Sequence, residues 1–457
     1  MIHTDPLTMQ YPTAVQTSLS ANAIFARFDP SGRFIATAQH QGSALIWDMD
    51  SKNAIRWLEG HVKPLTSMDW SRNSKYLLTT SKDWNAIVWD IETAAEVDPC
   101  QRKRTVRFDA PVVSGSFHPK NCKILLILLS TGEAFIVDLR KGHAGRFELY
   151  DQHEGDDQRP AAFTVVHFDP IGRYVFVGTS NGSILVFHSR TKTLLARHKV
   201  TGAGIMRGFA FTKGGRRLTT NSSDRVLRLF YLPTYPSPPA SSTTPSQPST
   251  PNPQIVNQIQ PESQVLEQEF EPVHRFHDPI TKTAWHTMSY SPDGDWLAGG
   301  AADPANHKIY IWDIQHNGQF TTTLDGGREP LVHVDWHPSK PMIASTTSQG
   351  TVLVWHYPTP ERWGAFAGGF EEVDENVVYE ECEDEFDIED ENELERRKKI
   401  EEEQFVDIDT LDDLLISSST GGTNGEVDED TAWALDEPDD DLPGWTLKVV
   451  IEVTPEY

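Results

Sequence analysis

Three residues in one stretch of the chain supply the side-chain types of a hydrolytic triad, namely His61, Ser81 and Asp83. A histidine held by a carboxylate can remove the proton of a serine hydroxyl, which then attacks a carbonyl carbon. Hydrolases often present this serine on a strained Gly-x-Ser-x-Gly turn, and Ser81 does not lie in such a turn. The residue types alone are therefore weak evidence for catalysis.

Metal or cofactor chemistry has even less support. Three cysteines, Cys100, Cys122 and Cys382, form no Cys-x-x-Cys pair, and no glycine-rich segment is followed by the Lys-Ser/Thr of a phosphate-binding loop. Further histidines lie in turns or at strand ends far apart in the sequence, without the spacing of metal ligands: His118, His167, His333, His337 and His356. We expect no catalytic residue, no metal site, no cofactor and no small-molecule substrate.

A repeated unit sets the context for these residues. Each unit has an aromatic residue, a short turn with Pro or Gly, an apolar stretch and a strand that ends in Trp-Asp or a related pair. The strand ends place an anchor at Trp47, Trp89, Val137, Phe187, Phe230, Trp312 and Trp355, mostly 42 to 50 residues apart. Seven units of this length predict an all-β fold, a seven-bladed WD40 β-propeller.

The propeller prediction has two local consequences. A strand within Ala14–Ser20 is expected to complete the blade that holds Trp355, because an open ring would leave unpaired strand edges. In a WD repeat, a loop histidine usually bonds a strand Ser or Thr, a turn Asp and the Trp N–H, so we expect His61, Ser81, Asp83 and Trp89 to stabilise the fold.

One long interval, between Phe230 and Trp312, contains an insert rich in Pro, Ser and Thr. Residues 233–254 are too polar and too rich in proline to form a core, so we expect a disordered loop there. The Gln- and Glu-rich stretch that ends at Phe270 is expected to form a short helix before the blade resumes.

Charge divides the chain into two parts. Residues 371–457 contain 33 acidic and 5 basic residues, which leaves 67 − 33 = 34 acidic and 40 − 5 = 35 basic residues before them. The first part is thus nearly neutral and the tail carries the excess negative charge. The longest aliphatic run, Ile124 to Leu129, is too short to cross a bilayer, and no signal peptide is visible, so we expect a soluble intracellular protein.

The start of the tail combines aromatic anchors with carboxylates, a composition that suits a segment ordering on a basic partner. RWGAFA, EEVDENVVYEE and EFDIEDE resemble the segment just past the propeller in the WD-repeat subunit of COMPASS/trithorax complexes, the retinoblastoma-binding protein five family. These complexes methylate lysine 4 of histone H3. RFDPSGRFIATA, WHPSKPMIAS and LVWHYP resemble blades of the same family, and the resemblance covers about residues 1–415.

The resemblance implies binding roles for two tail segments. The first would contact the catalytic SET domain and the SPRY-domain (Ash-two-like) subunit through Trp363, Phe366, Phe370, Glu372, Val373, Asp374, Glu375, Asn376, Val377, Tyr379, Glu380, Glu381, Phe386, Asp387, Ile388, Glu389 and Asp390. The second, EEEQFVDIDTLDD, would dock on a second, smaller propeller subunit through Phe405, Val406, Asp407, Ile408 and Asp409. The alternatives are a solubilising tail for the first and an accidental acidic-aliphatic stretch for the second.

The family also rests one propeller face on nucleosomal DNA. By position, the resemblance implies phosphate contacts from Arg225, Lys282 and Arg328, each of which could equally be a solvated charge at the rim.

The expected organisation is a propeller at 1–360 with its insert at 233–270, binding segments at 361–395 and 396–415, and an acidic tail at 416–457. Leu447, Val449, Ile451 and Val453 alternate there like a terminal strand. The resemblance implies a nuclear, non-catalytic scaffold that activates a histone methyltransferase and binds no membrane. The alternative is a substrate adaptor of a cullin-type ubiquitin ligase, whose Trp-Asp-x-Arg signature is approached only at Val137 to Arg140.

Overall fold

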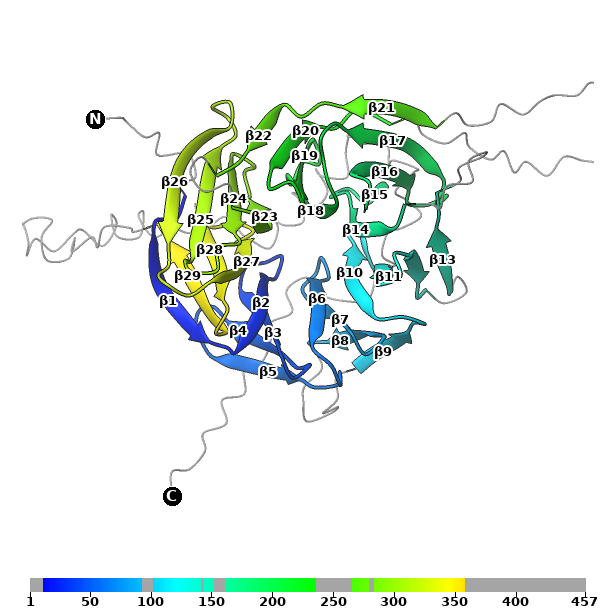
Figure 1. Cartoon of the computed structure of the whole chain (residues 1–457). Coiled ribbons are helices and arrows are strands. Elements are labelled where there is room, and N and C mark those ends of the chain that lie inside the picture. The colour runs from blue at the N-terminus through cyan, green and yellow to red at the C-terminus, as the bar shows by residue number, and fades with distance from the viewer. Residues whose placement is uncertain are drawn as a thin grey trace, which may run out of the picture. The chain divides into compact units, whose positions relative to one another are not determined.

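The computed structural model describes residues 11–92, 102–140, 144–151, 161–235, 265–278 and 283–357. In these ranges the chain forms 29 strands and no helix, so no helix there is long and apolar enough to span a bilayer. The strands form seven sheets, numbered here as blades 1 to 7, which follow one another around a centre (Figure 1). The prediction of an all-β propeller with seven blades is confirmed.

The first four blades follow the chain in order. Blade 1 contains β2 (Ala23–Phe28), β3 (Phe34–Gln39), β4 (Ala44–Asp48) and β5 (Ala54–Leu58). Blade 2 contains β6 (Leu65–Trp70), β7 (Tyr76–Ser81), β8 (Asn85–Asp90) and β9 (Arg102–Arg107). Blade 3 contains β10 (Val112–His118), β11 (Asn121–Leu129), β12 (Ala134–Asp138) and β13 (Gly145–Leu149). Blade 4 contains β14 (Phe163–Phe168), β15 (Tyr174–Thr179), β16 (Ser183–His188), β17 (Leu194–Val200) and β21 (Leu266–Phe270).

The last three blades complete the ring. Blade 5 contains β18 (Met206–Phe211), β19 (Arg217–Ser222), β20 (Leu227–Tyr231) and β22 (His274–Phe276). Blade 6 contains β23 (Trp285–Tyr290), β24 (Trp296–Ala301), β25 (Lys308–Asp313) and β26 (Gln319–Asp325). Blade 7 contains β27 (Leu331–Trp336), β28 (Met342–Thr347), β29 (Thr351–His356) and β1 (Ala14–Ser20).

The hydrophobic core lies between blades rather than within one sheet. The buried apolar residues form seven clusters, and each cluster joins two neighbouring blades. Trp89 and Phe34, for example, share the cluster between blades 1 and 2. A fully buried large apolar side chain contributes roughly 1.5–3 kcal/mol. Each blade is therefore held on both sides, and the apolar runs before the Trp-Asp positions are explained by burial on both faces.

The ring closes through the N-terminal strand. β1 pairs antiparallel with β29, from Ala14 opposite His356 to Ser20 opposite Thr351. The seventh cluster then joins Leu19 of β1 to Phe28 and Ile35 of blade 1. The predicted closing strand at Ala14–Ser20 is confirmed, and it pairs the outer edge of β29 that an open ring would expose.

The end of the insert does not form the expected helix. Residues Leu266–Phe270 form β21, which pairs in parallel with β17 as a fifth strand of blade 4. Phe270 is buried and stacks on Phe230 at 4.6 Å between ring centroids. The helix prediction was wrong because this aromatic contact and the β17 edge outweigh the helix propensity of Gln and Glu. Residues 236–254 of the predicted disordered loop lie outside the described residues.

Two ends of the blades carry different loops. Because strands alternate in direction, the turn between the second and third strands of a blade lies at the same end as the link to the next blade. We call this end the link face. Backbone hydrogen bonds join the two, as from Phe163 N to Gly132 O and from Ala23 N to Gly350 O. The opposite end carries the turns such as Asp-Pro-x-Gly, and we call it the turn face.

Candidate functional site

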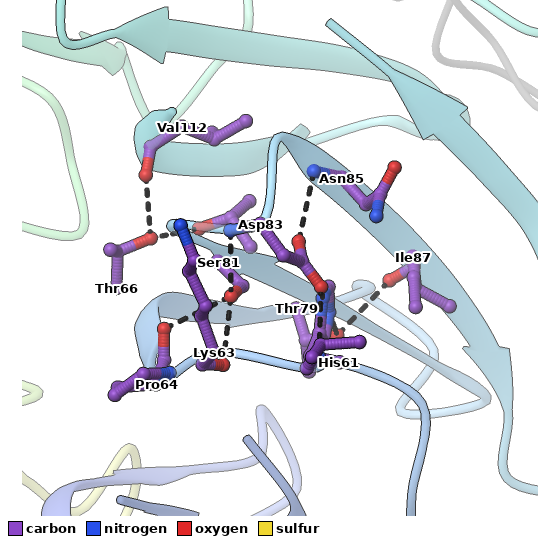
Figure 2. A network of polar contacts seen from close by, with 12 residues as sticks. His61, Lys63, Pro64, Thr66, Thr79, Ser81, Asp83, Asn85, Ile87 and Val112 are labelled. Carbon is purple, nitrogen blue, oxygen red and sulfur yellow. Dashed lines mark hydrogen bonds and ion pairs between the residues drawn. The ribbon is translucent and has the colours of Figure 1, made fainter. Parts of the chain in front are cut away.

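The residues of the candidate triad form a buried polar network in blade 2 (Figure 2). His61 Nδ1 lies 3.0 Å from Asp83 Oδ2, and His61 Nε2 lies 2.8 Å from the Thr79 hydroxyl. The indole N–H of Trp89 donates to the same hydroxyl at 2.7 Å. The predicted structural network is present, but its strand hydroxyl belongs to Thr79 and not to Ser81.

Ser81 has other partners. Its hydroxyl lies 2.9 Å from the carbonyl oxygen of Lys63 and 3.0 Å from that of Pro64, and it accepts the backbone N–H of Asp83. Side chains alternate along β7, so Thr79 and Ser81 share a face, and the sequence alone does not tell which hydroxyl meets His61. The network therefore joins the β5–β6 link, which connects blades 1 and 2, to the β7–β8 turn of blade 2.

The pKa shifts of His61 and Asp83 fit a structural role for this network. Burial lowers the pKa of His61, and Asp83 offsets this only in part, so the imidazole is neutral near pH 7. Desolvation acts to raise the pKa of Asp83, but His61 and the backbone N–H groups of Val62 and Asn85 outweigh it and hold that pKa low. Thr79 is fully buried, and its hydroxyl cannot reach a substrate in solvent.

A Gly-x-Ser-x-Gly pattern does occur elsewhere in the chain, as Gly-Thr-Ser-Asn-Gly at residues 178–182. In hydrolases this pattern forms a sharp turn from a strand into a helix. Here it forms the hairpin between β15 and β16 of blade 4. It therefore lacks the structural context that presents a nucleophile.

The other singled-out histidines take separate places. His118 Nε2 donates to Gly172 O and His337 Nε2 donates to Gly32 O, each at 2.9 Å. Burial lowers the pKa of His118 to about 4 and that of His333 to about 3. His167, His333 and His356 belong to β14, β27 and β29. In the described part of the chain, no group of three His, Cys, Asp or Glu side chains could hold a metal ion.

Sequence reasoning missed one partner set. In blade 7 the indole N–H of Trp355 donates to Ser345 Oγ at 2.8 Å, and His307 Nε2 lies 2.8 Å from the same oxygen. His307 comes from the β24–β25 loop of blade 6, not from the link before β27. The order His, hydroxyl residue, Trp is the same as in blade 2, but His307 lies earlier in the chain than the link where a loop histidine is expected, so only the Ser345 and Trp355 positions could have been found from the sequence.

The two described DNA-contact candidates lie on the link face. Arg225 is in the β19–β20 turn and Arg328 is in the link from β26 to β27, and both side chains are exposed. The carbonyl oxygen of Arg225 accepts the indole N–H of Trp285 at 3.0 Å, which joins this turn to the next blade. Lys282 lies outside the described residues.

Arg225 has an unusual backbone conformation. Its φ is +69°. Arg225 is the third residue after the second strand of its blade, and the residue at the same position has a positive φ in five other blades. Four of those five residues are glycines: Gly42, Gly132, Gly182 and Gly350. A side chain in this left-handed region is disfavoured by sterics. Arg225 thus lies at a position where this turn favours glycine.

All the tail residues assigned to the SET, SPRY and second-propeller subunits, Trp363 to Asp390 and Phe405 to Asp409, lie outside the described residues. So does the strand expected at 447–453.

Comparisons with known proteins agree with this architecture. Residues 52–90, 270–313 and 318–356 match the family described as WD domain, G-beta repeat. The chain is 31% identical over 415 residues to the Set1 complex component swd1 of Schizosaccharomyces pombe, covering 88% of this chain and 93% of that protein. It is 30% identical over 449 residues to the retinoblastoma-binding protein 5 homolog of Drosophila melanogaster, covering 95% of this chain and 82% of that protein.

A solved structure is similar as well. The β-propeller domain of Cps50 (Swd1) from Myceliophteria thermophila matches with a TM-score of 0.63 and 26% sequence identity. The match covers 76% of this chain and all of that domain.

Proposed function

The chain belongs to the Swd1/retinoblastoma-binding protein 5 family, and from this premise we propose that it is a scaffold subunit of a COMPASS-type histone H3 lysine-4 methyltransferase complex. In this role it holds the SET-domain enzyme in its active arrangement with a SPRY-domain subunit and a smaller propeller subunit. The chemistry belongs to the SET subunit, and the chain itself is a non-catalytic protein of the nucleus.

The observation that carries this proposal is the extent of the match. Only 100 of the 457 residues follow Tyr357, so a match over 95% of the chain includes most of the acidic tail as well as the propeller. Many unrelated proteins share a propeller, and a fold alone says little about function. A propeller and tail that match together point to one subunit type.

Within this proposal the tail makes the specific contacts. Trp363 to Asn376 lies against the SET and SPRY domains, and Val377 to Asp390 binds the SPRY domain. Phe405 to Asp409 docks on the smaller propeller. Apolar anchors such as Phe386 and Ile388 fill pockets, while the carboxylates beside them pair with arginines, whose fork suits bidentate binding.

The propeller contributes a DNA-binding face. Arg225 and Arg328 present cations from the link face, and Lys282 precedes Trp285 in the same link that meets the Arg225 turn. The strained backbone of Arg225 supports this role, because such positions are often retained for function.

The two alternative functions, a hydrolase and a ubiquitin-ligase adaptor, lack comparable support. The buried Thr79 hydroxyl is engaged by both His61 and the indole N–H of Trp89, which leaves no exposed nucleophile in the network. Arg140 belongs to the segment that partly matches the ubiquitin-ligase signature. Its guanidinium Nη2 forms an ion pair with Asp138 Oδ2, two residues before it, at 2.7 Å.

Methyltransferase activity on nucleosomes tests the proposal. The SET, SPRY and smaller-propeller subunits are reconstituted with the full-length chain, with a truncation after Tyr357, or with a variant in which Phe386, Asp387 and Ile388 are changed to Ala. The full-length chain should stimulate H3 lysine-4 methylation strongly, and both altered forms should lose SPRY binding and stimulation.

A matched control changes Val427, Asp428 and Glu429 to Ala, which removes a similar apolar and acidic triplet outside the assigned segments. This control should stimulate like the full-length chain. Equal stimulation by the truncation would show that the tail is not the activating element. Failure of the full-length chain to bind any of the three subunits would refute the proposed function.

A further inference from the structure

A tryptophan occupies a strained turn on the link face of blade 2. Trp84 has φ +74° in the β7–β8 turn, the position that is glycine in blades 1, 3, 4 and 7. A bulky aromatic residue is rare in this left-handed region, because its Cβ lies too close to the backbone. Its side chain is nevertheless 40% exposed, so burial in the core does not account for the strain.

A hollow of about 340 Å³ lies beside Trp84. Its lining residues come from the link before β6, from the β7–β8 turn, from the start of β8 and from the end of β9: Val62, Lys63, Asp83, Trp84, Asn85 and Arg107. Val62 is 86% exposed, which adds a second apolar surface at the rim. Exposed apolar groups that line a concave surface are typical of binding sites.

The charges that this hollow offers to a ligand are positive. Lys63 and Arg107 are exposed, and the Arg107 guanidinium lies 6.0 Å from the centre of the Trp84 ring. The one carboxylate in the lining, Asp83, is turned inward. Its two oxygens accept from His61, from Val62 N and from Asn85 N. The hollow therefore complements an apolar group next to a negative charge.

The surroundings hold the hollow in shape. His61, which also bonds Thr79, holds Asp83 in place (Figure 2). Asp83 is the residue before Trp84, and Trp89 donates to the same Thr79 hydroxyl. On the other side, Phe108 N donates to the carbonyl oxygen of Trp84 at 2.8 Å. A preformed site loses little conformational freedom when a ligand binds.

We propose that this hollow on blade 2 binds a linear acidic peptide motif of a partner protein. An aromatic or aliphatic side chain of the motif packs on Trp84 and Val62, and the carboxylates beside it pair with Lys63 and Arg107. A single-stranded nucleic acid fits less well, since it needs a row of cations along its backbone and this hollow presents two.

The test uses a phage-displayed library of random 12-residue peptides, selected on the full-length protein and in parallel on its Trp84→Gly variant. Sequences that require Trp84 should carry an apolar residue flanked by Asp or Glu. One such peptide is then synthesised with a fluorescent label and titrated by anisotropy. Its affinity should fall at least about tenfold in Trp84→Gly and several-fold in Arg107→Gln, and added salt should weaken it.

Trp84→Gly separates binding from folding, because glycine is the residue that four other blades have at this position. Its melting temperature should equal or exceed that of the unchanged protein. Phe320→Ser, which removes a 43% exposed aromatic residue from blade 6, is the matched control and should bind normally.

Three results would overturn the proposal. A lower melting temperature in Trp84→Gly, with no peptide that distinguishes the two proteins, would make Trp84 a structural residue. Selected sequences that are basic would contradict the charge argument. Displacement of the peptide by a 12-nucleotide oligo(dT), together with tighter binding of that oligonucleotide, would assign the hollow to nucleic acid.

Discussion

The imidazole of His337 donates a hydrogen bond to the carbonyl oxygen of Gly32 at 2.9 Å, although 305 residues separate them. The bond joins the His-Pro turn of blade 7 to the Asp-Pro-x-Gly turn of blade 1, on the turn face. His118 of blade 3 makes the same bond to Gly172 of blade 4, also at 2.9 Å. The two pairs show that matching turn sequences in adjacent blades lock those blades together.

Gly32→Ala should weaken the junction between blades 7 and 1. A Cβ at Gly32 would lie 2.2 Å from His337 Cε1, and φ is +77° there, so the variant has both a clash and backbone strain. We expect a loss of about 2–3 kcal/mol of unfolding free energy, measured by urea denaturation. Gly215→Ala is the control, since φ is +67° and the nearest atom is 3.6 Å away. Equal losses in both variants would mean that the clash with the His337 ring adds nothing to the cost of backbone strain.

His118 should make the fold sensitive to acid. Burial lowers its pKa to about 4, whereas an unfolded histidine has a pKa of about 6.5. Below pH 6.5 the unfolded chain therefore binds a proton that the folded chain does not, and the stability contributed at pH 7 is lost as pH falls toward 4. His118→Gln keeps an N–H donor for Gly172 but does not titrate.

Relative to His118→Gln, the unchanged protein should therefore lose about 2 kcal/mol of unfolding free energy between pH 7 and pH 5. Urea denaturation at pH 7, 6 and 5 measures it. A difference that stays constant over this range would show that His118 has an ordinary pKa in the fold.

Thr79→Val should destabilise blade 2 without changing its shape. The variant removes the one hydroxyl that serves both His61 and Trp89, and it leaves two buried polar groups without their partner. We expect a loss of about 2–3 kcal/mol, measured by thermal and urea denaturation. Thr105→Val, at an exposed position of β9 in the same blade, should change stability by less than about 0.5 kcal/mol. A loss of similar size at Thr105 would refute the network explanation.

The sequence predicts the propeller well because its signals are local and repeated. The apolar strand that contains each anchor is buried between blades, and the number of anchors, seven, equals the number of sheets. The closing strand at Ala14–Ser20 follows from the same logic, since the edge of β29 needs a partner. Repetition thus compensates for weak individual motifs such as Val137.

Contacts between distant segments are harder to predict. Leu266–Phe270 becomes a strand because β17 and Phe230 are nearby, which the Gln- and Glu-rich composition does not reveal. His307 reaches Ser345 from another blade, and Thr79 replaces Ser81 in the His61 network. The strain at Trp84 and Arg225 appears only in backbone angles, although both residues stand where glycine is usual.

Arg225→Gly tests whether the link face binds DNA. Glycine accepts the φ of +69° without strain, so the variant should fold at least as well as the unchanged protein. Loss of one phosphate contact should weaken nucleosome binding by the reconstituted complex at every DNA sequence. It should also reduce the slope of log affinity against log salt by about 1. Arg216→Ser, an exposed arginine on the turn face, is the control and should leave the slope unchanged. An unchanged slope in Arg225→Gly would remove Arg225 from the DNA-binding face, whatever the tail contributes to the complex.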